Sequence, residues 1–159
     1  MKRIGYHIGH LVGIIFVAAV IYFVFLIWLE HDYFLSQRVV PPAEVTLEEW
    51  LDSFKFWGTV GILSALAAAL VWYILGQLIF KINNWRDSGK RVFWFLLLLL
   101  PIIAVVLGIV FTKQAQEGAI FAYLFYALNW VLCYYLATAL CSPSAFKYTP
   151  PGASAIRRW

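Results

Sequence analysis

Residues 92–112 have the sequence VFWFLLLLLPIIAVVLGIVFT, which contains no lysine, arginine, aspartate or glutamate. An α-helix rises about 1.5 Å per residue, so about 20 apolar residues cross the roughly 30 Å hydrocarbon core of a bilayer. A membrane-spanning strand would instead alternate apolar and polar residues over about ten positions, which this run does not do. The stretch therefore predicts a transmembrane helix, whose backbone groups bond to one another within the segment.

Three more charge-free stretches flank this one, and each is long enough for one crossing but too short for two. They are Ile4–Leu29, Phe56–Phe80 and Gly118–Phe146. We therefore expect an all-α integral membrane protein with four transmembrane helices. The predicted spans are about 6–29, 56–80, 92–112 and 118–141 within a domain of residues 1–142, followed by a proline-rich tail over 143–159.

The composition of the whole chain agrees with a lipid environment. Of its 159 residues, 64% are hydrophobic and 13% are charged, whereas a soluble domain carries about 25% charged residues. So few charged side chains cannot cover the surface of a water-soluble domain. The net charge of +4 therefore does not indicate nucleic acid. The expected partners are membrane lipids and other membrane-protein subunits, in a homo- or hetero-oligomer.

Basic residues are concentrated on one side of the predicted spans. Nine of the twelve fall at the amino terminus, in the 81–91 connection or in the tail, and three fall in the 30–55 and 112–117 connections. Because lysine and arginine are retained on the cytoplasmic side, both termini are predicted to be cytoplasmic. The expected location is the inner (plasma) membrane of a bacterium.

The predicted outer loop at residues 30–55 contains a helix start signal. Thr46 and Glu49 have the spacing of a capping box, and Val45 and Trp50 occupy the positions of the accompanying hydrophobic staple. We expect a short extracytoplasmic interfacial helix that begins near Leu47 and precedes the second span.

Small residues recur at a spacing of about four within the predicted spans, which lets the backbones of neighbouring helices approach closely. Asn129 is a carboxamide near the centre of the fourth span, where it should face another helix or a pore, because an unpaired amide in lipid is costly. The predicted helix-packing residues are Gly5, Gly9, Gly13, Gly61, Ala65, Ala69, Ala104, Gly108 and Asn129.

The chain has no motif that indicates catalysis, a metal site or a cofactor. His7 and His10 share one side of the first span, but no cysteine or carboxylate lies near them in sequence to complete a metal site. Cys133 and Cys141 do not form the C-x-x-C pattern of a thiol oxidoreductase. We therefore expect neither enzymatic activity nor a bound metal or cofactor.

The tail differs in composition from the spans, because aromatic and basic residues alternate with proline and small residues. Aromatic residues and arginine are enriched where proteins bury surface against partners. A tail that lies on the inner leaflet is the alternative. The predicted partner-binding residues are Phe146, Tyr148, Ile156, Arg157, Arg158 and Trp159.

Together these features predict a non-catalytic multispan subunit that packs into a larger inner-membrane assembly, of the secretion, conjugation, defence or immunity type. Its cytoplasmic tail would dock on a partner. The alternative is a self-associating small channel or transporter with Pro101 and Asn129 near the permeation path.

Overall fold

The protein is described from a computed structural model, which defines residues 2–30, 40–77, 86–112, 119–142, 146 and 149–153. The described residues form four α-helices. Their bounds are α1 Lys2–Glu30, α2 Leu47–Leu75, α3 Asp87–Phe111 and α4 Ala119–Cys141.

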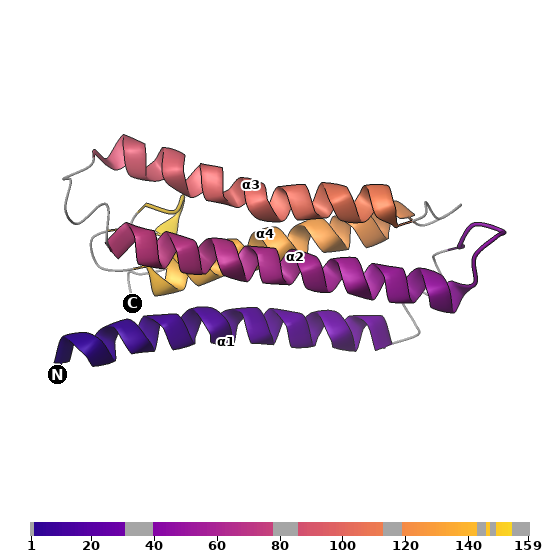
Figure 1. Cartoon of the computed structure of the whole chain (residues 1–159), viewed down its shortest axis with the longest axis horizontal. Coiled ribbons are helices and arrows are strands. Elements are labelled where there is room, and N and C mark those ends of the chain that lie inside the picture. The colour runs from indigo at the N-terminus through magenta and orange to yellow at the C-terminus, as the bar shows by residue number, and fades with distance from the viewer. Residues whose placement is uncertain are drawn as a thin grey trace.

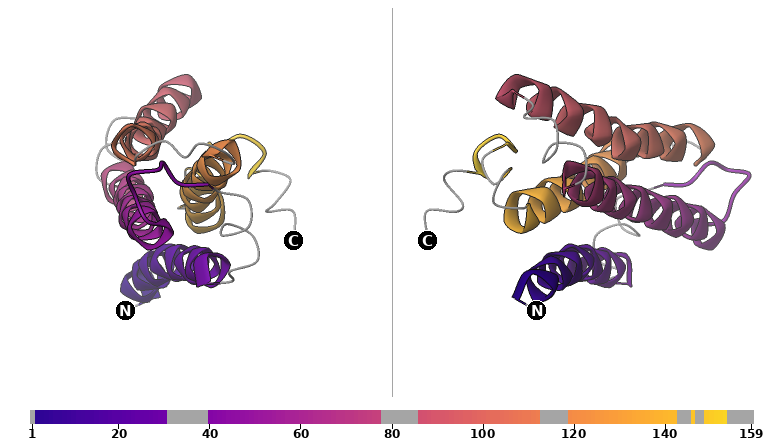
Figure 2. Two further views of the ribbon diagram at one scale, coloured as in Figure 1. Left: turned by 90° about the vertical axis from the view of Figure 1, so that its right-hand side faces the viewer. Right: turned by 60° about the vertical axis from the view of Figure 1, so that its left-hand side comes forward.

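The four helices run antiparallel to their neighbours in sequence along one common axis (Figure 1). Helices α2 and α4 contact each other and both remaining helices, so they form the centre of the bundle. The end-on view in Figure 2 places α1 and α3 on opposite sides of this pair. We call the end with the start of α1 and the finish of α4 the tail end, and the opposite end, where α2 begins, the loop end.

Three of the helices are long and apolar enough to cross a membrane. Their candidate spans are Gly5–Ile27, Leu47–Leu75 and Ser88–Phe111. In α4 the described apolar stretch is shorter, Ala127–Cys141. The prediction of an all-α, four-helix protein is thereby confirmed, and the three long helices indicate an integral membrane protein. A fourth crossing and the cytoplasmic termini stay predictions.

The start of α2 confirms one expectation and corrects another. The helix begins at Leu47, and the capping box is present: Glu49 N donates to Thr46 Oγ1 over 3.2 Å, and Thr46 N donates to Glu49 Oε2 over 3.1 Å. However, the expected short interfacial helix is not a separate element, because the same helix continues to Leu75. A started helix gains one hydrogen bond for each residue added, and no proline interrupts it here.

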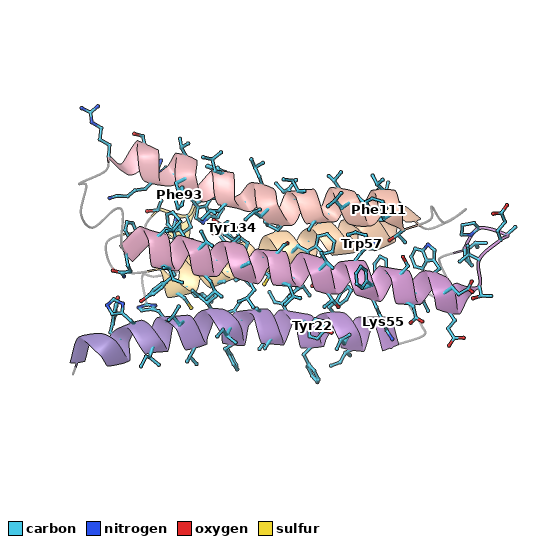
Figure 3. The ribbon with its side chains drawn as sticks, in the orientation of Figure 1. Tyr22, Lys55, Trp57, Phe93, Phe111 and Tyr134 are labelled. Carbon is cyan, nitrogen blue, oxygen red and sulfur yellow. The ribbon has the colours of Figure 1, made fainter. Side chains whose placement is uncertain are left out.

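Aromatic rings join the helices at the loop end. The Phe25 ring on α1 stacks on Phe54 of α2, with 6.2 Å between ring centroids. Trp57 of α2 stacks on Phe111 of α3 at 5.3 Å and an interplanar angle of 9° (Figure 3). These contacts align the first turns of α2 with the bundle, which explains why they do not form an independent helix.

Replacing Thr46 by alanine is expected to lower the free energy of unfolding by about 1 kcal/mol, because an N-cap side chain is lost. Thermal unfolding in detergent, followed by circular dichroism, measures this change. Glu48→Gln is the matched control, because Glu48 lies in the same exposed turn but outside the capping box. Equal midpoints for Thr46→Ala and the unmodified chain would contradict the role of this cap.

Candidate functional site

Buried side-chain hydrogen bonds join helices at the tail end, where α2, α3 and α4 meet. At a spacing of four, two residues of α4 and the residue that follows its end place three hydroxyl groups along one face: Tyr134, Thr138 and Ser142. We call these three residues, with Trp72 and Trp94, the tail-end network. All five side chains are buried, and Figure 3 shows Tyr134 inside this end of the bundle.

Each indole N–H of the network donates to a hydroxyl group on α4 or just after it. Trp72 Nε1 donates to Ser142 Oγ, and Trp94 Nε1 donates to Thr138 Oγ1, each over 2.9 Å. The Tyr134 hydroxyl donates to the Trp94 carbonyl oxygen, also over 2.9 Å. Ser142, just after α4, therefore bonds to α2, and Thr138 and Tyr134 of α4 bond to α3.

The hydroxyl groups of Thr138 and Ser142 donate in turn to the backbone of α4. Thr138 Oγ1 lies 2.9 Å from the Tyr134 carbonyl oxygen, and Ser142 Oγ donates to the Thr138 carbonyl oxygen. The Thr138 and Ser142 hydroxyls thus each accept a bond from another helix and donate one to a carbonyl of α4. A buried polar group is costly unless it is paired, so the network favours one register of the three helices.

The tail folds back onto this network. Phe146 is 2% exposed, and its ring meets Trp72 edge-on at 5.7 Å between centroids. Lys90 Nζ lies over the Phe146 ring, 5.7 Å from its centroid. The Tyr135 hydroxyl donates to the Pro151 carbonyl oxygen over 2.7 Å. Gly152 makes the turn at this point with a φ of 74°, a conformation that favours glycine.

This placement changes the interpretation of the predicted partner-binding residues. Phe146 is occupied by the chain's own helices, so its side chain is not available to a partner in this structure. The sequence could not separate an aromatic residue that docks internally from one that docks on another protein. The remaining predicted residues lie outside the described part of the chain: Tyr148, Ile156, Arg157, Arg158 and Trp159.

The predicted helix-packing residues divide into two groups. The first group packs closely against another helix: a Cβ added at Gly61 would overlap the Trp130 ring of α4, and one added at Gly13 would lie 2.8 Å from Cys141 Sγ. At Gly5 and Gly9, by contrast, an added Cβ would have no neighbour within 4 Å. The buried members on α2 and α3 are Ala65, Ala69, Ala104 and Gly108. Asn129 is half-buried on α4.

Two close contacts were not anticipated from the sequence. An added Cβ at Gly58 would overlap the Phe25 ring, so this glycine also permits close packing of α1 on α2. The second contact joins His7 Nδ1 to the Tyr73 hydroxyl over 2.8 Å. The spacing of Gly58 and Gly61 on α2 was an available signal for the first. No local pattern indicated the second, because its residues are far apart in sequence.

Within the described residues, no cluster of three histidine, cysteine, aspartate or glutamate side chains could hold a metal ion. The thiols of Cys133 and Cys141 are both buried and free of disulfide bonds.

Cavities open on the described surface at the loop end and between α1 and α2. One, of about 440 Å³, opens at the loop end beside Glu44, Glu49, Trp50 and Phe111. The other, of about 270 Å³, is an apolar groove between α1 and α2.

Comparison of this chain with protein-family models, curated proteins and solved structures found no match in any of the three. The functional interpretation therefore depends on the geometry alone.

Proposed function

We propose that the chain is a non-catalytic integral membrane subunit that packs against another membrane protein through α1. The chain would cross a bacterial inner membrane four times, with both termini in the cytoplasm. The residues beyond Ala153 would supply the tail segment that contacts a cytoplasmic partner.

The observation that carries this proposal is the contrast between glycines on one helix. The space beside Gly13 is occupied by the Cys141 side chain, whereas Gly5 and Gly9 face open space. Val12 and Phe16 continue the exposed face of these two glycines at spacings of three and four. We call these four residues the open α1 face.

A face of glycines lets the backbone of a second helix approach closely and make packing contacts along it. Lipid tails packed on the same face would not give this advantage. Helix α1 also has the least internal packing of the three long helices. In its most apolar stretch 17% of the residues are buried, against 44% in α2 and 33% in α3. The open α1 face is therefore the best surface that the bundle offers to a second membrane helix.

The helix arrangement supports four crossings. Helix α4 has 23 residues and runs antiparallel to α3 through the bundle, which brings its end back beside the start of α1 (Figure 1). Described basic residues at the tail end include Arg86, Lys90 and Arg91, whereas carboxylates gather near the start of α2. This charge difference favours a cytoplasmic tail end.

The alternative of a small channel gains no support from the bundle centre. Trp72, Trp130 and Tyr134 are completely buried there, and their rings fill the space between α2 and its neighbours. A permeation path would have to run between copies of the chain.

Replacing Gly9 by leucine tests the proposal. The unmodified chain should purify in mild detergent with a stoichiometric membrane-protein companion, identified by mass spectrometry of the intact complex. The leucine should weaken this association on the order of tenfold, equivalent to about 1.4 kcal/mol, by keeping the two helix backbones apart. The thermal midpoint of the separated chain should not fall, because the new side chain meets open space.

Val110→Leu serves as the matched control, since Val110 is 68% exposed on α3, away from the open α1 face. It should leave the companion bound. A chain that purifies alone, or a Gly9→Leu variant that retains its companion at full affinity, would contradict the proposal.

A further inference from the structure

We propose that the groove between α1 and α2 binds one zwitterionic phospholipid, with an acyl chain in the groove and the phosphate at Lys55. This site is separate from the open α1 face and does not depend on the proposed subunit role.

The groove is hollow because α1 has small side chains where α2 has large ones. Ala18 and Ala19 lie opposite Ile62 and Leu63. The groove holds about 270 Å³. Its complete lining is Ile15, Ala18, Ala19, Tyr22, Thr59, Ile62, Leu63 and Leu66.

The shape and chemistry of this hollow suit a hydrocarbon chain. From Ile15 to Tyr22 the groove follows about 10 Å of helix axis. Its lining is apolar except near Tyr22 and Thr59, and it opens to the side of the bundle, where lipid surrounds a membrane helix. Thr59 itself is satisfied internally, because its Oγ1 donates to the Lys55 carbonyl oxygen over 2.9 Å.

A cationic side chain stands at the polar end of the groove. Lys55 precedes Thr59 by one helical turn on the same face of α2. Figure 3 shows Tyr22 and Lys55 on neighbouring stretches of α1 and α2, on the loop-end side of the bundle. A lysine can place its methylene stem along apolar surface and its ammonium in the headgroup layer. The ammonium of Lys55 therefore suits a lipid phosphate.

The surrounding charges indicate which headgroup fits best. In the part of the chain that the structure describes, the Lys55 side chain makes no ion pair. Asp52 lies one turn further from the membrane centre and is exposed, with Glu48 and Glu49 beyond it. An anionic headgroup would meet these carboxylates, whereas a headgroup amine beyond the phosphate would be attracted to them. A phosphoethanolamine headgroup satisfies both charges.

Native mass spectrometry of the full chain in detergent, titrated with phosphatidylethanolamine, tests the site. Ala19→Phe should weaken binding at least tenfold by filling the groove, and Leu63→Trp should do the same from the opposite wall. Both residues line the groove and are exposed, so larger side chains there should fill the groove without displacing the core. Val20→Phe is the matched control, because Val20 is exposed on α1 but does not line the groove.

The headgroup contact is tested separately. Lys55→Gln should weaken phosphatidylethanolamine binding on the order of tenfold, and Lys55→Arg should preserve it. Diacylglycerol, which lacks the phosphate, and phosphatidylglycerol, which lacks the amine, should both bind more weakly to the unmodified chain. Equal binding of diacylglycerol, tighter binding of phosphatidylglycerol, or binding unaffected by both groove-filling variants would overturn the proposal.

Discussion

Gly61→Ala should lower the free energy of unfolding by about 3 kcal/mol, the upper part of the usual range for overpacking a core. A Cβ at this position would lie less than 3.0 Å from three atoms of the Trp130 ring. That ring cannot move aside easily, because it is completely buried and rigid. Helix α2 would therefore have to separate from α4, which it contacts along the centre of the bundle. Thermal or denaturant unfolding in detergent measures the loss.

Two further variants separate this clash from a general effect of alanine. Gly9→Ala adds the same methyl group to a helix in open space and should be neutral or slightly stabilising. Trp130→Leu should remove the obstacle, so Gly61→Ala should cost 1 kcal/mol or less, as an order-of-magnitude figure, when introduced into that variant. A Gly61→Ala chain as stable as the original would contradict the close contact of α2 with α4.

The positions of the helices could be predicted from the sequence because lipid imposes a strict rule on the backbone. Charge-free runs of about 20 residues must satisfy their own hydrogen bonds, and a helix does so. Helix ends were less predictable, because helical hydrogen bonding does not stop where hydropathy falls. Thus α3 begins at Asp87 and not near Val92, and the first turns of α2 belong to the same helix as its apolar part.

The roles of individual residues could not be predicted to the same degree. Gly5, Gly9 and Gly13 follow one another at the same spacing, yet the third packs against Cys141 and the first two face open space. The deciding neighbour comes from a helix far away in sequence. The same is true of Phe146. The composition of the tail suggested that this residue contacts a partner, but its ring lies against Trp72. Spacing identifies a face that permits packing, and only the fold identifies what covers it.

Phe146→Ala should release the tail from the bundle. The substitution removes the ring that contacts Trp72 and Lys90 and leaves a cavity beside Gly76. Truncation of a buried phenylalanine costs about 3 kcal/mol or more. Because Phe146 lies outside the four helices and packs against them from the segment after α4, most of this cost should appear as local opening and not as global unfolding.

Limited proteolysis of the detergent-solubilised chain measures this opening. Trypsin cleaves after lysine, and Lys147 directly follows Phe146 in the sequence. When opening and closing are faster than cleavage, the cleavage rate follows the open population. A loss of about 3 kcal/mol therefore corresponds to cleavage on the order of 100-fold faster.

Tyr135→Phe should produce a smaller acceleration, because it removes only the hydrogen bond to Pro151. Phe56→Ala is the control for loss of a phenyl ring, since Phe56 is 61% exposed and should leave the rate unchanged. If Phe146→Ala and Phe56→Ala are cleaved at the same rate, Phe146 does not hold the tail, and the partner contact that the sequence suggested becomes the better interpretation of this residue.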